Sequence, residues 1–287
     1  MKLAVPALVL ASLFACANTY AQSPALAADQ IAVGAKPYAV QTAVAGAGRY
    51  TVIFESGFGT GMSAWRKVAP ELAKDARVVT YSRAGHGSSE ARPEPRTIAQ
   101  NTNELEQLIA AQKLAPPFIL VGHSYGGLLM RAYAARHPEQ VAGMVLVDPS
   151  DERFNAALRK LDATRAAADD EQFAKFVPPK FQPELKLLQP VLDGAAAPYA
   201  GKLPDVPTVV LTSVQQAEKP MFFLETADAV AIKQSLHADF LRQFSKGSQV
   251  VTAKSGHSIQ MEEPELVIAA VRKVIALADQ AGAQAAR

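Results

Sequence analysis

The chain has 287 residues, of which 49% are hydrophobic and 20% are charged. This balance excludes a disordered chain and provides enough apolar side chains for a large core. The formal net charge is only +2, and no run of Lys or Arg exceeds two residues, which argues against nucleic acid as a partner.

Residues 1–21 have the pattern of a signal peptide. Lys2 precedes an apolar stretch over residues 3–17, and small residues stand at Thr19 and Ala21, where signal peptidase would cleave. We therefore expect an exported protein, periplasmic or secreted, whose mature chain begins near Gln22. The apolar stretch is shorter than the roughly 20 residues that a membrane span needs. No later stretch is longer, so we expect no transmembrane segment.

A lipoprotein signal is the alternative interpretation of the same stretch. Cys16 would then be lipidated and become the new N-terminus, although Phe14 is bulky for such a signal. Cys16 is the only cysteine, so the mature chain forms no internal disulfide under either interpretation.

From about Tyr38 onward, short β-branched runs alternate with amphipathic helical patterns, which predicts an α/β fold. Several strands are apolar almost without alternation, as expected for a mostly parallel sheet covered by helices on both faces. The predicted strands are Tyr38–Val44, Tyr50–Glu55, Arg77–Tyr81, Phe118–Val121, Gly143–Asp148, Thr208–Thr212 and Gln249–Ala253. The predicted helices are Ala64–Ala73, Thr97–Gln112, Gly126–Arg136 and Glu265–Ala278.

Residues 149–206 interrupt this alternation, because they contain no convincing strand and are rich in charge, alanine and proline. Short helices are expected near 151–168 and 170–176. We interpret the segment as a cap inserted between two strands of a single domain, residues 22–287, and lying over the strand ends. The alternative is a helical excursion without a role in the site.

A serine between glycines marks the candidate active site. In Gly122-His123-Ser124-Tyr125-Gly126 the serine stands where a predicted strand ends and a predicted helix begins. Such a turn strains the backbone, exposes the hydroxyl above the sheet and points helix N–H groups at it. We predict that Ser124 is a nucleophile.

A serine nucleophile needs a base, and a base needs an orienting acid. His257 follows the last predicted strand in a Ser-Gly loop, on the same sheet edge as Ser124, and is the predicted base. His123, His137 and His237 fit structural or solvated positions better, whereas His86 could line the site or serve its own loop.

The acid is less clearly marked. Asp148 ends the strand that follows the serine's helix and is our first choice, although it could be a turn residue before Pro149. Glu218 is the first carboxylate after the next strand, and Asp228 is a further alternative.

The motifs "GHSYGG", "YSRAGHGSS", "VLVDPS" and "SGHSIQMEEPELV" together resemble the α/β-hydrolase superfamily, in its serine esterase and lipase-like branch. The resemblance implies that backbone N–H groups of Tyr125 and Phe58 form an oxyanion hole. Many relatives carry a histidine in the segment that holds Ser56 here, and many carry the acid at a place that Gln216 occupies here. Other relatives place the acid one strand earlier, as Asp148 does.

The leading hypothesis is an exported, carboxylesterase-like serine hydrolase that acts on small or medium apolar esters through Ser124, His257 and Asp148. The same residues could serve amide, thioester, carbon–carbon, perhydrolysis or acyl-transfer chemistry, and a binding protein on this fold is the least favoured alternative. No metal or organic cofactor is expected. The sequence does not indicate an oligomeric state.

Apolar side chains in the predicted cap have two interpretations: an acyl or aromatic pocket, or the cap's own core. They are Phe173, Phe176, Phe181, Leu185, Leu187, Leu188 and Tyr199.

Overall fold

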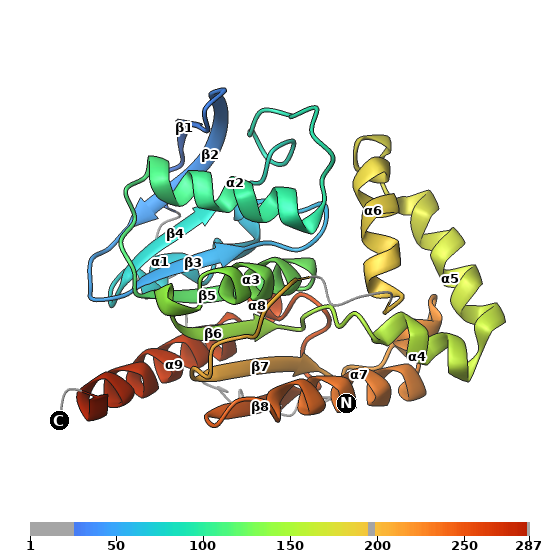
Figure 1. Cartoon of the computed structure of the whole chain (residues 1–287). Helices are drawn as coiled ribbons and strands as arrows, with labels where there is room; N and C mark the ends of the chain where they lie inside the picture. Colours follow the sequence, from blue (N-terminus) through green and yellow to red (C-terminus); the bar gives the residue numbers. More distant parts are fainter. Residues whose placement is uncertain (1–25, 195–198, 286–287) are drawn as a thin grey trace, which may run out of the picture.

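The computed structural model describes residues 26–194 and 199–285, so the predicted signal peptide and Cys16 lie outside the described residues. One eight-stranded sheet runs through the molecule in the order β1-β2-β4-β3-β5-β6-β7-β8 (Figure 1). The strands are β1 (Asp29–Val33), β2 (Tyr38–Ala45), β3 (Thr51–Glu55), β4 (Arg77–Tyr81), β5 (Phe118–His123), β6 (Val141–Val147), β7 (Thr208–Ser213) and β8 (Gly247–Thr252).

The predicted parallel sheet is confirmed from β4 to β8, whose neighbouring strands all pair in parallel. The pairs β1–β2 and β2–β4 are antiparallel. Strand β1 was not predicted. It is an edge strand whose residues are mostly exposed, so its sequence lacks the continuous apolar run of a central strand.

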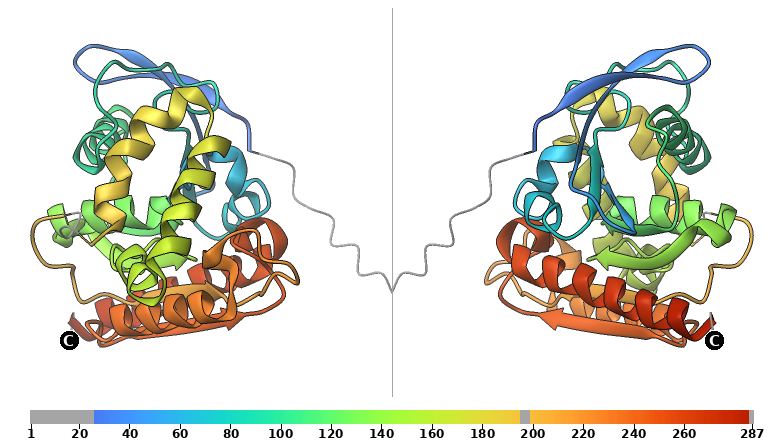
Figure 2. Two further views of the ribbon diagram at one scale, coloured as in Figure 1. Left: turned by 90° about the vertical axis from the view of Figure 1, so that its right-hand side faces the viewer. Right: turned by 90° about the vertical axis from the view of Figure 1, so that its left-hand side faces the viewer.

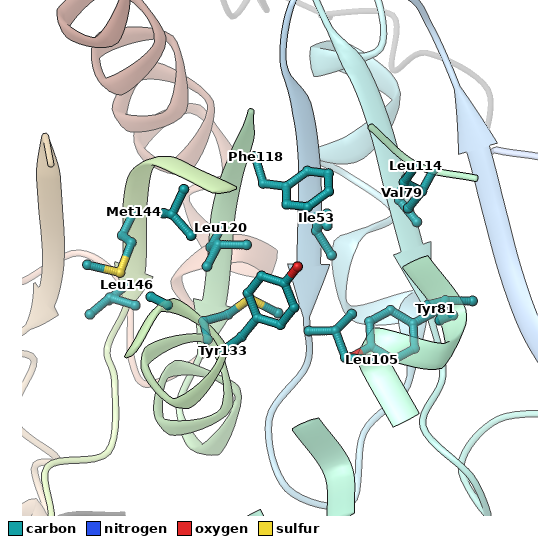
Figure 3. Packing of buried hydrophobic residues seen from close by; sticks show 14 of the residues in the cluster. Ile53, Val79, Tyr81, Leu105, Leu114, Phe118, Leu120, Tyr133, Met144 and Leu146 are labelled. Atoms are coloured by element: carbon teal, nitrogen blue, oxygen red, sulfur yellow. The ribbon is translucent and has the colours of Figure 1, made fainter. Parts of the chain in front are cut away.

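Helices cover both faces of the sheet. Helices α2 (Ile98–Ala111), α3 (Tyr125–Arg136) and α7 (Ala227–Leu241) pack on one face. There Tyr133 of α3 packs against Phe118 of β5, and Leu105 of α2 belongs to the same buried cluster (Figure 3). Helices α1 (Ala69–Leu72), α8 (Ile259–Glu262) and α9 (Pro264–Ala285) pack on the other face. Successive residues of β5 therefore alternate between two buried cores, which explains why all six are buried.

The segment between β6 and β7 holds α4 (Phe154–Leu161), α5 (Ala163–Phe176) and α6 (Gln182–Leu192). These helices stand beside the ends of the central strands (Figure 2). Helices α4 and α5 correspond to the predicted short helices but divide at Asp162, whose side chain accepts a hydrogen bond from the N–H of Arg165 and so caps α5. Helix α6 was not predicted, because it carries Pro190 in its interior, a residue that normally ends a helix.

The predicted helix Ala64–Ala73 is instead two short pieces, the 3₁₀ helix η1 (Met62–Trp65) and α1. Pro70 lies at the start of α1, where its missing N–H is tolerated, and the same proline prevents one continuous helix. The other 3₁₀ helices are η2 (Pro138–Gln140), η3 (Pro179–Phe181) and η4 (Phe223–Glu225). Within the described ranges, no helix has the length and apolarity needed to span a bilayer.

Candidate catalytic site

Ser124 occupies the tight turn between β5 and α3, with φ 53° and ψ −122°. A non-glycine residue with positive φ is strained, and such strain is typical of functional sites. The turn brings chain segments so close that a Cβ on Gly122 would lie 2.6 Å from the carbonyl oxygen of Gly126. A Cβ on Gly126 would lie 2.4 Å from the carbonyl oxygen of Glu55. The glycines on either side of Ser124 are thus required by packing.

His257 lies in the loop after β8, and its side chain is 57% exposed. Its Nδ1 is 2.7 Å from Oδ2 of Asp148. Because the carboxylate accepts the proton from Nδ1, the lone pair of Nε2 remains available to act as a base. Ser124, His257 and Asp148 line one pocket.

Asp148 directly follows β6, and its side chain is fully buried. Its Oδ1 accepts a hydrogen bond from the N–H of Ser213 at 3.0 Å, and its Oδ2 accepts from both His257 and Lys233. Burial alone would raise the pKa of Asp148, but the hydrogen bond and charge of His257, followed by the charge of Lys233, hold that pKa well below its usual range. The buried carboxyl is therefore ionised.

The alternative acids lie elsewhere: Glu218 and Asp228 are both exposed. Among the described residues, Asp148 is the one carboxylate that is hydrogen-bonded to the His257 ring. Asp148 comes from β6, the strand next to the serine's β5, and reaches His257 across the end of β7.

The loop after β3 carries Phe58 at the edge of the site, where it packs against Tyr125 and Phe181. Tyr125 is the first residue of α3, so its N–H has no carbonyl partner within the helix. The backbone N–H groups of Phe58 and Tyr125 are both candidates for holding an oxyanion.

Arg83 braces this loop, and sequence reasoning missed it. Its guanidinium is buried, pairs with Glu55 at 2.5 Å, and donates to the carbonyl oxygens of Ser56 at 2.7 Å and Gly57 at 2.9 Å. The signal was available in "YSRAGHGSS", since Arg83 follows β4, which pairs with β3. The guanidinium thus fixes the backbone of two successive residues of this loop.

The other histidines are buried or lie apart from Ser124. Burial, and then the charge of Arg83, lower the pKa of His86 to about 3, and its ring stacks on Phe181. His237 lines the Ser124 pocket but its ring nitrogens are bonded to the Thr212 hydroxyl and the Pro149 carbonyl oxygen. His137 lies 2.7 Å from Glu106.

His123 supports the loop of the base. Its Nε2 donates to the backbone carbonyl oxygen of His257 at 2.9 Å, and the two rings lie 4.7 Å apart. Burial, followed by the charge of His257, lowers the pKa of His123 to about 3. His123 is therefore neutral and carries its proton on Nε2.

The pocket has a volume of about 390 Å³, within the range of small-molecule sites. Its apolar wall is formed by Pro149, Phe154, Leu192, Phe222 and Leu224. The cap residues singled out from the sequence do not line it. Phe181, Leu185 and Leu188 pack in small cores, and Phe173 and Phe176 are exposed. Within the described residues, no cluster of side chains is arranged to hold a metal.

Comparisons with known proteins agree with this architecture. A family model described as "alpha/beta hydrolase fold" matches residues 50–189. The uncharacterized protein YqjL of Bacillus subtilis is 28% identical over 248 residues, covering 83% of this chain and 88% of its own.

Solved structures match over nearly the same extent. A thermophilic esterase from Thermogutta terrifontis has a TM-score of 0.57 at 21% identity, covering 88% of this chain and 99% of its own. An enol-lactonase from Burkholderia xenovorans LB400 has a TM-score of 0.57 at 20% identity, covering 86% and 100%. At these identities the likeness shows the fold.

Proposed function

The chain belongs to the α/β-hydrolase superfamily, and we propose that it is a serine hydrolase of the carboxylesterase type. The observation that carries this proposal is the shared pocket of Ser124 and His257, with His257 held through Nδ1 by a buried, ionised Asp148 at 2.7 Å. Nucleophile, base and orienting acid in that order are the parts that acyl transfer needs.

The reaction then proceeds through an acyl-enzyme. Ser124 Oγ attacks the ester carbonyl as His257 Nε2 takes its proton, and the N–H groups of Phe58 and Tyr125 hold the oxyanion. The tetrahedral intermediate collapses, and the alcohol leaves with the proton from His257. Water, deprotonated by His257, attacks the acyl-enzyme, and the carboxylic acid is released as Ser124 recovers its proton.

The pocket favours small or medium apolar acyl groups. Its wall is largely apolar, and a volume of about 390 Å³ suits a compact apolar group. Two of its apolar side chains, Phe154 and Leu192, come from the segment between β6 and β7. In this proposal that segment selects the substrate.

We also propose that the protein is exported. Residues 1–21 would be removed and the mature protein would begin near Gln22, with lipidation of Cys16 as the alternative. The mass of the protein recovered from its native host distinguishes the two, because lipidation adds acyl chains to a chain that begins at residue 16.

The test uses purified protein with p-nitrophenyl esters of increasing chain length and a fluorophosphonate probe. Wild type should label and should hydrolyse the short esters best. Ser124→Ala should lose both reactions, and Asp148→Asn should lose about 10³–10⁴-fold in kcat, whereas Glu218→Gln should match wild type. An unlabelled, inactive wild type would refute the hydrolase proposal, and an inactive Glu218→Gln beside an active Asp148→Asn would refute the choice of acid.

A further inference from the structure

The buried carboxylate that orients His257 also binds a lysine. Lys233 Nζ lies 2.9 Å from Oδ2 of Asp148, the same oxygen that His257 Nδ1 approaches at 2.7 Å. Because both nitrogens donate to the same oxygen, the distance between them cannot exceed the sum of the two donor–acceptor distances. The lysine charge is therefore a near neighbour of the imidazole.

Asp148 does not need Lys233 to hold its position. The N–H of Ser213 binds the other carboxylate oxygen, and Asp148's own N–H donates to the carbonyl oxygen of Leu211 at 2.8 Å. The carboxylate is thus fixed from β7 through the backbone. What Lys233 adds is a positive charge.

The charge changes the electrostatics of proton transfer. A negatively charged Asp148 alone would stabilise a protonated His257 ring. The ammonium of Lys233 cancels part of that negative charge and so weakens this stabilisation, and it also repels the protonated ring directly. Both effects oppose the formation of a positive charge on the His257 ring.

Two further carboxylates line the Ser124 pocket, Asp151 and Glu225, and each has partners of its own. The His123 ring, which packs against that of His257, is neutral. Asp151 forms its own ion pair with Arg153 at 2.7 Å, and Glu225 accepts hydrogen bonds from backbone N–H groups in its own turn. His237 lies one turn along α7 from Lys233. Burial is the main factor that lowers the pKa of His237, so its ring is neutral. Among the described residues that line the Ser124 pocket, Lys233 is the one Lys or Arg.

We propose that Lys233 sets the lower limit of the pH range in which His257 acts as a base, by neutralising Asp148 and repelling the imidazolium. The ammonium is partly open to the pocket, with its side chain 22% exposed, so solvent weakens but does not remove the interaction. The kinetic form of this inference rests on the proposed esterase function.

The experiment compares wild type with Lys233→Met, which removes the charge and keeps the stem, and Lys233→Arg, which keeps the charge. Lys219→Met, an exposed lysine outside the pocket, is the matched control. The pH dependence of kcat/KM reports the base in the free enzyme. In Lys233→Met the acid limb should move to higher pH by about one unit. The limbs of Lys233→Arg and Lys219→Met should coincide with that of wild type.

A second readout is independent of catalysis. The His257 ring is titrated by NMR with ¹³C-labelled histidine, and His257→Gln identifies its signal among five histidines. The midpoint should rise in Lys233→Met by the same amount. Coincident midpoints overturn the inference, even if the rate falls. A shifted midpoint in a protein that hydrolyses no ester supports the inference and refutes the esterase proposal instead. If Lys233→Met does not fold, Lys233→Gln takes its place.

Discussion

The Nε2 atom of His123 donates to the backbone carbonyl oxygen of His257 at 2.9 Å, joining the residue before the nucleophile to the residue proposed as its base. The carbonyl oxygen has no proton, so the imidazole must be the donor. This bond fixes the backbone of an otherwise exposed loop at the position from which the His257 side chain projects.

Replacing His123 should therefore lower the rate indirectly, by releasing the loop that positions His257. His123→Phe keeps a ring but loses the donor, and we expect kcat/KM to fall about tenfold, equivalent to one lost hydrogen bond. His123→Gln can donate from a similar position and should recover most of the rate. Equal rates for His123→Phe and wild type would contradict this role. The measurement is ester hydrolysis, with circular dichroism to confirm folding.

Arg83 should affect both stability and rate. Arg83→Met leaves Glu55 buried and unpaired, which should cost about 3–5 kcal/mol in unfolding free energy. Adding Glu55→Gln should recover part of that stability, but kcat should stay low because the carbonyl oxygens of Ser56 and Gly57 still lack their donor. Denaturant unfolding and ester kinetics on both variants separate the two effects. Full recovery of kcat in the double variant would show that Arg83 acts only through charge balance.

Gly126 should tolerate no side chain. Gly126→Ala places a Cβ 2.4 Å from the carbonyl oxygen of Glu55, so the turn that holds Ser124 must open and fluorophosphonate labelling should be lost. Gly282→Ala in α9 is the matched control, since its Cβ meets only the guanidinium end of Arg49, at 3.0 Å. That variant should label normally and unfold at the same or a slightly higher temperature.

Acid should destabilise the protein through its buried histidines. The pKa of His86 is lowered from 6.5 to about 3. Between these two pH values His86 therefore binds a proton in the unfolded chain but not in the folded protein. Stability is fully present above pH 6.5 and is lost as pH falls toward 3, at about 1.4 kcal/mol per pH unit. His86→Phe should make the pH dependence of unfolding shallower by this amount.

The control for that slope is Phe244→Leu, which removes a buried ring that packs against Phe240 but no titratable group. It should lower the unfolding free energy at every pH and leave the slope unchanged. Parallel slopes for His86→Phe and wild type would mean that His86 is not the group that takes up the proton. Urea unfolding between pH 4 and 7 provides the measurement.

The features that the sequence predicted well have local causes. The strand and helix beside Ser124 follow from the apolar run and the glycines, and the parallel order follows from strands that are apolar on both faces. Asp148 could be selected because it ends a strand, a place that sequence can locate. The three residues predicted as nucleophile, base and acid lie at one pocket, whereas the two predicted oxyanion donors, Phe58 and Tyr125, are not among its lining residues.

The features that were missed depend on tertiary contacts. Arg83 reaches Ser56 from the loop after β4, and Lys233 reaches Asp148 from α7, 85 positions along the chain. Neither contact leaves a periodic pattern in the sequence. The apolar pocket wall includes Phe222 and Leu224 from the turn before α7, and Phe154 from the inserted segment. Among the aromatic residues for which a pocket role was one interpretation, Phe181 packs in a small core and Phe173 and Phe176 are exposed, since core packing is the commoner fate of such side chains.

The segment with α4, α5 and α6 leaves the sheet after β6 and returns at β7, and these two strands are direct neighbours. Its two ends are therefore anchored side by side on a rigid base. Changes in its length or composition need not move β5 or β8, the strands that precede Ser124 and His257. On the proposal that this segment selects the substrate, grafting it from a relative should change the ester preference while the proposed nucleophile, base and acid keep their positions.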